Sequence, residues 1–198
     1  VKTVLYKDQS YCLGIAYNEE RRELYWTAAK SIVSGSAVPP SHSSGGRNPP
    51  YRTLFSLDLA KKLLYLKYDP ITDTVYVSTL NYVYACSMRQ YDRSDCKIIV
   101  RDLVSARGLY LDIAGRHLYV VDHKRRSVKR VRLANSPDAE IGYDLYDESS
   151  VTTVLSPETV PDLGDTFYVA LYKDAIIWSE FSGKIKMASL NGTRSAVT

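Results

Sequence analysis

Three histidines and three cysteines are the side chains of this chain best suited to catalysis or to metal binding. His42 lies in a tract rich in Ser, Gly and Pro, whereas His117 stands in an apolar run and His123 in a basic loop. No two of them have the spacing of metal ligands, and the chain has no Gly-x-Ser-x-Gly, Walker or glycine-rich nucleotide motif. We therefore expect no catalytic residue, no metal site and no cofactor.

The cysteines predict one disulfide. Cys86 and Cys96 lie in two predicted strands that are joined by the nine-residue loop SMRQYDRSD. A bridge between them would brace a hairpin, stabilise it by roughly 2 to 3 kcal/mol and imply an oxidising, extracellular compartment. Cys12 is left over, and two interpretations stay open: a partner outside this sequence, or a buried free thiol.

Asn191 opens the sequence Asn191-Gly192-Thr193, which is an N-glycosylation sequon. The same Asn-Gly pair is also a favoured tight turn between two strands. Asn191 is therefore a candidate glycosylation site and a candidate turn residue.

Short strands in a repeated pattern must position these residues. In the clearest unit, Arg107 to Leu133, two apolar runs flank a tight turn and are followed by a polar loop and an alternating run. Four pairs of residues eight positions apart mark the repeat: Tyr17 and Tyr25, Tyr68 and Tyr76, Leu111 and Tyr119, Val169 and Ile177. The second members lie 51, 43 and 58 residues apart, so the unit is roughly 40 to 45 residues with insertions. A strand-only repeat of this length predicts the blades of a β-propeller.

The repeat resembles the YWTD repeat of low-density-lipoprotein-receptor-type β-propellers. The resemblance rests on Leu24-Tyr25-Trp26-Thr27, on Gly108 to Asp112 before Leu118 to Asp122, and on Gly183 to Thr193. It covers nearly the whole chain but is degenerate, because Ala28 stands where that family has Asp and the later units keep Asp122 or Glu180 without Trp-Thr. It implies an all-β propeller with about four blades present. These are either part of a six-bladed ring, as is usual in that family, or an atypical four-bladed form. A propeller of another family is the alternative.

We expect a single domain over 1–198 with blades at about 12–62, 63–104, 105–156 and 165–198. Two mobile insertions are expected, 31–50 between the second and third strands of the first blade, and the acidic segment 134–150. Glycine eleven residues before Tyr25 and Tyr119 should let inner strands approach closely. Val1 to Tyr6 and Arg194 to Thr198 are expected to be outer strands of an open ring. The chain is therefore interpreted as an excised fragment, which we expect to self-associate.

Charge is unevenly distributed, although the net charge is only +4. Eight basic residues fall between Arg107 and Arg132, while five acids fall between Asp138 and Glu148. The basic stretch suits an acidic protein or a sulfated glycan as partner, or it is a set of solvated strand edges that discourages aggregation. The apolar runs are of strand length and none resembles a membrane span.

One rim of a propeller is formed by the turns between second and third strands together with the connections between blades. Aromatic and basic residues there are of the type that dominates protein interfaces. The candidate ligand-contacting residues are Asn81, Tyr82, His123, Lys124, Arg125, Arg126 and Phe181.

The resemblance implies a non-catalytic function. We expect an extracellular, protein-ligand-binding propeller of a cell-surface receptor, in endocytosis, signalling or adhesion, with a protein partner of acidic character, no nucleic acid and a membrane-anchored parent chain. Two alternatives stay open. One is a secreted hydrolase or lactonase with calcium in the channel, for which Tyr17, Asp69, Asp112 and Asn18 are the available ligands. The other is a structural propeller of the extracellular matrix.

Overall fold

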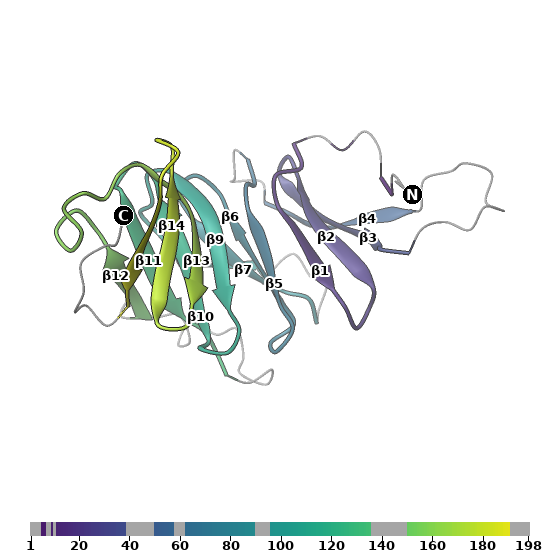
Figure 1. Ribbon diagram of the computed structural model, residues 1–198. Coiled ribbons are helices and arrows are strands. Elements are labelled where there is room, and N and C mark those ends of the chain that lie inside the picture. The colour runs from purple at the N-terminus through teal and green to yellow at the C-terminus, as the bar shows by residue number, and fades with distance from the viewer. Residues whose placement is uncertain are drawn as a thin grey trace.

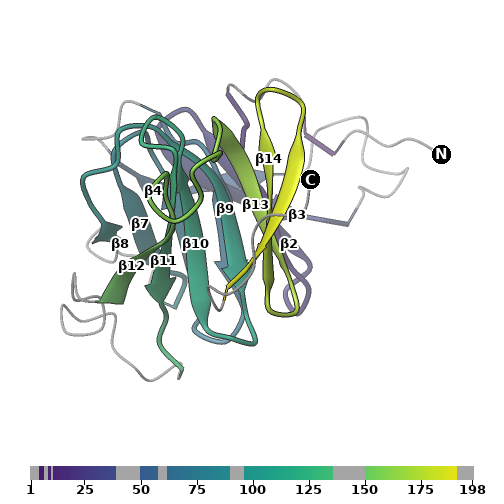
Figure 2. The same ribbon diagram turned by 60° about the vertical axis from the view of Figure 1, so that its left-hand side comes forward.

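The computed structural model describes residues 5–6, 9, 11–38, 50–57, 62–89, 96–135 and 150–190. Their strands form four antiparallel sheets, three of four strands and one of three, and each sheet is a meander in which consecutive strands pair. Figure 2 shows this order in sheet 3, with β9 beside β13 of the next sheet. Sheet 1 contains β1 (Ile15–Asn18), β2 (Glu23–Ala28), β3 (Ser31–Ser36) and β4 (Tyr51–Ser56); sheet 2 contains β5 (Leu66–Asp69), β6 (Thr74–Ser78), β7 (Val83–Ser87) and β8 (Cys96–Val100); sheet 3 contains β9 (Ala106–Asp112), β10 (His117–Asp122), β11 (Ser127–Arg132) and β12 (Val151–Leu155); sheet 4 contains β13 (Thr166–Tyr172), β14 (Ala175–Glu180) and β15 (Ile185–Ser189).

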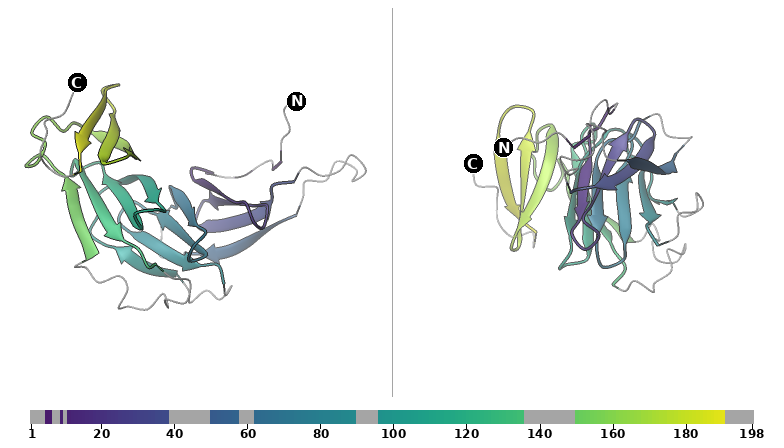
Figure 3. Two further views of the ribbon diagram at one scale, coloured as in Figure 1. Left: turned by 60° about the horizontal axis from the view of Figure 1, so that its bottom comes forward. Right: turned by 90° about the vertical axis from the view of Figure 1, so that its right-hand side faces the viewer.

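The sheets follow one another in chain order along an arc, with sheets 1 and 4 at its two ends (Figures 1 and 3). Strands alternate their side chains between two faces, so each sheet has a forward face toward the next sheet and a backward face toward the preceding one. Tyr25 and Ile32 on the forward face of sheet 1 pack with Leu66 and Val77 on the backward face of sheet 2. Two equivalent cores lie between sheets 2 and 3 and between sheets 3 and 4. The prediction of an all-β propeller with about four blades is confirmed.

Two glycines permit the close approach of first strands. A Cβ atom on Gly14 would lie 2.5 Å from the Leu66 backbone nitrogen, and one on Gly108 would lie 2.5 Å from Cδ2 of Tyr168. Both contacts are too short for a side chain: Gly14 faces the backbone of the neighbouring sheet, and Gly108 faces the Tyr168 ring and, at 3.0 Å, its Cα atom. Glycine at these positions therefore serves the role that the sequence predicts for it.

The expected mobile loop over 31–50 is wrong for its first six residues, which form β3. Ile32 and Val33 are buried on opposite faces, which outweighs the Ser- and Gly-rich composition that suggested a loop. Gly35 leaves room for the Tyr6 side chain, since a Cβ atom on Gly35 would lie 2.2 Å from the Tyr6 hydroxyl oxygen. Tyr51–Ser56 is consequently the fourth strand of sheet 1, and the insertion follows the third strand. Residues 39–49 of this tract and 136–149 of the second insertion lie outside the described residues.

The predicted outer strand over Val1 to Tyr6 is not present at Leu5 and Tyr6, its two described residues. The Tyr6 ring instead packs 4.7 Å from the Trp26 ring, and its hydroxyl donates to the Ser36 carbonyl oxygen at 2.8 Å. Covering Trp26 in this way buries the backward face of sheet 1 over β2 and β3. Asn191 and the expected strand Arg194 to Thr198 lie outside the described residues.

The forward face of sheet 4 and the β1 part of the backward face of sheet 1 remain open. Ile32, Val83 and Val128 occupy equivalent forward positions in sheets 1 to 3 and are 0% exposed, whereas Ile185 in sheet 4 is 76% exposed. On the backward faces, Leu66, Leu109 and Val169 are at most 2% exposed, whereas the equivalent Ile15 of sheet 1 is 61% exposed. Each end sheet thus presents apolar side chains that the inner sheets bury against a neighbour.

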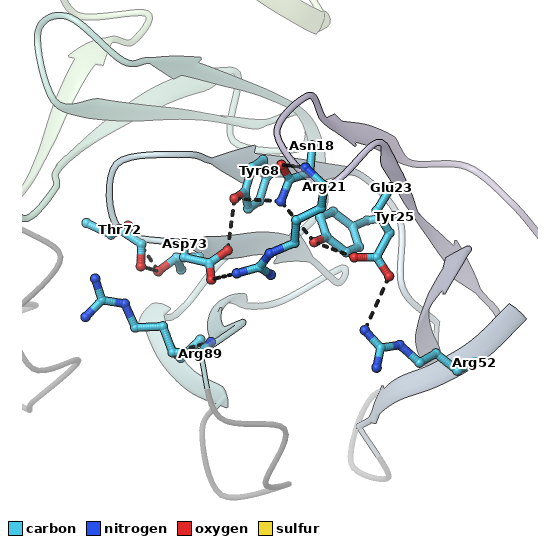
Figure 4. A network of polar contacts seen from close by, with 11 residues as sticks. Asn18, Arg21, Glu23, Tyr25, Arg52, Tyr68, Thr72, Asp73 and Arg89 are labelled. Atoms are coloured by element: carbon cyan, nitrogen blue, oxygen red, sulfur yellow. Dashed lines mark hydrogen bonds and ion pairs between the residues drawn. The ribbon is translucent and has the colours of Figure 1, made fainter. Parts of the chain in front are cut away.

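Ion pairs join neighbouring sheets at the rim formed by the turns between first and second strands, called here the lower rim. Arg116 contacts both carboxylate oxygens of the fully buried Asp69, with Nη1 to Oδ1 at 3.0 Å and Nη2 to Oδ2 at 2.6 Å. Between sheets 1 and 2, Arg21 pairs with Asp73, and Asn18 donates to the Tyr68 hydroxyl at 2.9 Å (Figure 4). These contacts cross-link the sheets at one end of their shared cores.

Candidate binding rim

The opposite rim, called here the upper rim, is built by a repeated side-chain contact. The residues Thr27, Ser78, Asp122 and Glu180 each end or nearly end a second strand and are buried. Each accepts a backbone N–H of the segment that enters the first strand of its own sheet. The donors are Gly14 to Thr27 at 3.0 Å, Tyr65 to Ser78 at 3.2 Å, Val104 and Ser105 to Asp122 at 3.0 and 3.1 Å, and Gly164 to Glu180 at 2.9 Å. The linkers between sheets are thereby held beside the turns that begin there.

An aromatic cluster stands on this rim where sheets 2, 3 and 4 meet. The ring of Phe181, in the β14–β15 turn, lies 5.0 Å from the His123 ring and 4.8 Å from the Phe167 ring. Phe167 in turn lies 6.5 Å from Tyr65, which precedes β5. Phe181 is 62% exposed, so the cluster, defined as Tyr65, His123, Phe167 and Phe181, presents an aromatic ring to solvent.

The His123 ring is fixed within this cluster by a hydrogen bond. Its Nδ1 lies 3.2 Å from the Thr166 carbonyl oxygen. A carbonyl can only accept, so Nδ1 carries the proton and Nε2 is left for another partner. The backbone of His123 is also held, since its N–H donates to the Ser105 carbonyl at 3.0 Å. The ring is therefore positioned before any ligand arrives.

The basic candidates of the β10–β11 turn divide into two kinds. Arg125 donates to the Asp102 carbonyl oxygen and lies 4.0 Å from the Asp122 carboxylate, so it braces the linker between sheets 2 and 3. Lys124 and Arg126 are exposed and flank it. These two cations are the ones that the turn offers to a ligand beside the aromatic cluster.

The remaining predicted rim residues lie in the β6–β7 turn. The Asn81 side chain donates to the Leu103 carbonyl oxygen at 2.9 Å, so its role is to hold a linker. The Tyr82 ring is partly exposed and pairs with Tyr84 at 6.2 Å instead of joining the aromatic cluster. The structure thus brings His123 and Phe181 together and leaves Tyr82 apart. Phe167 and Tyr65 were missed because both lie at strand starts, where an aromatic residue usually signals a core position.

Of the four side chains considered for calcium, Asp69 and Asn18 are buried in interior contacts, whereas Tyr17 is exposed and Asp112 makes a hydrogen bond within its own surface turn. Asp69 accepts from Arg116, from the Thr72 hydroxyl at 2.7 Å and from the Ile71 N–H at 3.1 Å. Asn18 is buried against Tyr25 and Tyr68, and Asp112 accepts from the Gly115 N–H at 2.9 Å. Within the described ranges, no cluster of three or more His, Cys, Asp and Glu residues could hold a metal ion.

Cys86 and Cys96 form a disulfide between β7 and β8, where they are directly opposite each other. Cys12 is a free thiol and is exposed, so the interpretation of a buried free cysteine is wrong. No helix in the described part of the chain is long and apolar enough to span a membrane.

Comparison with known proteins finds no family model that matches this chain and no curated protein that matches it. Solved structures do match. A chain of a nidogen/laminin complex is 18% identical with a TM-score of 0.51 over 93% of this chain and 78% of that one. The WD40 β-propeller domain of Doa1 is 11% identical with a TM-score of 0.63, over 96% of this chain and 54% of that one. An auxiliary nutrient-binding protein from Bacteroides thetaiotaomicron is 8% identical with a TM-score of 0.63, over 96% of this chain and 42% of that one.

Identities this low show the fold alone. Propellers of different kinds match nearly all of this chain, and the four sheets with their meander order agree with them. The chain therefore has a β-propeller fold in which four sheets form an open arc.

Proposed function

We propose that this chain is a non-catalytic protein-binding propeller of the YWTD type, from the extracellular part of a cell-surface receptor, and that it binds its protein ligand at the upper rim. One observation carries the proposal: the exposed Phe181 ring stands on a fixed aromatic base, with the exposed cations Lys124 and Arg126 in the β10–β11 turn of the neighbouring sheet. Aromatic rings held in place and flanked by exposed charge are typical of interface hot spots, because little side-chain entropy is lost on binding.

The Cys86–Cys96 bridge supports an extracellular location, since such bridges persist in oxidising compartments. The YWTD assignment rests on the Leu24 to Thr27 motif and on the equivalent Asp122 and Glu180. Both acids accept linker N–H groups at the ends of second strands, which gives the motif a structural reason. As part of the same proposal, further sheets complete a ring of six by covering the two open end faces.

A matrix component is the second candidate function. It is favoured by the likeness to a chain of a nidogen/laminin complex, which is an assembly of two proteins. The two candidates use the same binding rim and differ in the partner: a soluble ligand for a receptor, another matrix protein for a structural module.

The test is a binding screen of the purified chain against secreted proteins and extracellular domains, followed by variants. Phe181→Ser should weaken the affinity for any captured partner by about tenfold or more. The matched control is Ile71→Ser, which removes an exposed apolar side chain from the lower rim. Equal affinity of Phe181→Ser and wild type would refute the upper rim as the site. Binding should also survive a chelator, whereas the calcium-hydrolase alternative predicts an activity that a chelator abolishes and calcium restores.

A further inference from the structure

A second surface, at the lower rim, has the chemistry of an anion-binding site. A pocket of about 660 Å³ opens beside the start of β10 and the end of β11. His123 lies at the opposite end of these two strands. Polar and basic side chains line it: His117, Arg130, Arg132, Asn135, Ser150 and Thr152. The pocket is separate from the upper rim and does not depend on the function proposed above.

The forward face of sheet 3 differs here from the same face of the other sheets. The cross-strand pair Tyr119–Arg130 is equivalent to Tyr25–Ser34 and Tyr76–Ala85, whose small members are fully buried under the next sheet. One step further out, sheets 1, 2 and 4 have the pairs Glu23–Ser36, Thr74–Ser87 and Ala175–Ser189, whereas sheet 3 has His117–Arg132.

Two guanidinium groups therefore stand where sheets 1 and 2 have only serine or alanine and sheet 4 has Met187 and Ser189. A guanidinium cannot be buried against an apolar sheet without a large desolvation cost. The interface between sheets 3 and 4 accordingly stays open at this end, and the charges face the pocket. This departure from the repeat is local, since Val128 and Leu155 on the same face are buried in the core.

In the part of the chain that the structure describes, little negative charge opposes these cations. Among the described residues, Arg130 and Arg132 have no ion pair, while the nearby Arg116 is already paired with Asp69. The acid that faces His117 is Asp112, directly opposite on β9, and its Oδ1 already accepts the Gly115 N–H. Burial and the charges of Arg130 and Arg132 lower the pKa of His117, as expected in a positive environment.

We propose that this pocket binds an extended acidic segment of a partner protein, with carboxylates on alternate residues. Arg130 and Arg132 are two residues apart on one strand, so their side chains leave the same face about 6.6 Å apart. Alternate side chains of an extended peptide repeat with that same spacing, so two carboxylates could each meet one guanidinium in a charge-assisted, bidentate contact. Asn135, Ser150 and Thr152 supply hydrogen-bonding groups to the rest of the peptide, and Ser150 Oγ is buried without a partner among the described residues.

The test uses a fluorescent extended peptide containing Glu-x-Glu, titrated with the whole chain at low salt. We expect micromolar binding that weakens at least tenfold in the Arg130→Ala/Arg132→Ala variant. The control, Lys124→Ala/Lys129→Ala, removes the same charge from the upper rim and from the opposite face of β11, and should bind as wild type does. A scrambled peptide with adjacent glutamates should bind more weakly.

Three results would overturn the proposal: no binding, equal loss in both double variants, or equal affinity for the scrambled peptide. A heparin-derived tetrasaccharide serves as the competing probe. If it binds more tightly than the peptide and its binding depends on Arg130 and Arg132, the site recognises sulfated glycan and the peptide assignment is wrong.

Discussion

Single residues at or next to the ends of the four second strands perform one task with different chemistry. Thr27, Ser78, Asp122 and Glu180 all accept backbone N–H groups from the incoming linker. A hydroxyl suffices in the first two sheets, whereas the last two use a buried carboxylate. In sheet 4 the carboxylate has a further partner, because the Glu180 Oε1 lies 3.1 Å from the ammonium group of Lys186.

Asp122→Ala should be strongly destabilising, because it removes two hydrogen bonds to a buried carboxylate and leaves the N–H groups of Val104 and Ser105 unsatisfied. We expect a loss of about 2 to 4 kcal/mol in the free energy of unfolding, measured by urea denaturation. Asp174→Ala, at an exposed turn, is the control and should change it by less than about 0.5 kcal/mol. Similar values for the two variants would contradict the role given to Asp122.

His117 should make the chain less stable in mild acid. Burial and the neighbouring Arg130 lower the pKa of His117 in the folded state, so the unfolded chain binds the proton more tightly. The stability that neutral His117 contributes to the folded state is complete above the unfolded pKa of about 6.5, and it is lost as the pH falls below that value. The free energy of unfolding should therefore decline between pH 7 and pH 5, and less so in His117→Gln.

Glu180 does not interfere with that measurement. Although burial opposes it, hydrogen bonds from Gly164 and Lys186 hold its pKa below the ordinary value, so its contribution is lost only under more acidic conditions. An equal decline in wild type and His117→Gln between pH 7 and pH 5 would show that His117 is not responsible.

At the scale of elements, the sheets are joined by contacts that no local sequence pattern announces. Arg116 and Asp69 are 47 residues apart, yet they form a buried ion pair between the β9–β10 turn and the end of β5. Asp69 also caps its own turn, so a lone turn aspartate was the natural interpretation of the sequence. The ion pair becomes visible only when the two sheets are placed side by side.

Arg116→Ala should cost about 3 to 5 kcal/mol, because it leaves Asp69 buried and without its counter-charge. The double variant Arg116→Ala/Asp69→Asn should lose less free energy of unfolding than the two single variants lose together, because the charge that needs compensation is gone. Chemical denaturation of the two single variants and the double variant gives this coupling energy directly. Strict additivity would mean that the two side chains do not interact.

The strands were largely predictable because their apolar residues recur with the period of the blade. The pairing of Cys86 with Cys96 was predictable because both cysteines lie at the loop ends of one hairpin. The strand Ser31–Ser36 was not predictable from the sequence. Its small residues leave room for Tyr6 and for the next sheet, and they also give the segment the composition of a loop. Of the candidate site, His123 and Phe181 were found by their place in the turns, but their contact depends on packing between sheets.

At the scale of the molecule, the open ends of the arc have a direct consequence for behaviour in solution. Ile185 and Ile15 are exposed at positions that the inner sheets bury. Covering either end face with another apolar surface would therefore lower the free energy of the system. The forward face of sheet 4 and the part of the backward face of sheet 1 that Tyr6 leaves uncovered are complementary in kind, because such faces pack together three times within the chain.

We expect the 198-residue chain on its own to self-associate at micromolar concentration, as measured by analytical ultracentrifugation. The double change Ile15→Lys/Ile185→Lys should shift it toward the monomer. Ile113→Lys, at an exposed turn off both faces, is the control and should leave association unchanged. A sharp monomer peak for the wild type would contradict the prediction.

The measurement that tests the functional account most directly is hydrogen exchange of the chain with and without the partner captured in the screen. If the upper rim is the binding surface, amides of the turns 123–126 and 181–184 and of the start of β13 should exchange more slowly in the complex, while those of the lower-rim turns keep their rates. Protection confined to the lower rim, or absent from both turns, would contradict the assignment of protein binding to the aromatic cluster.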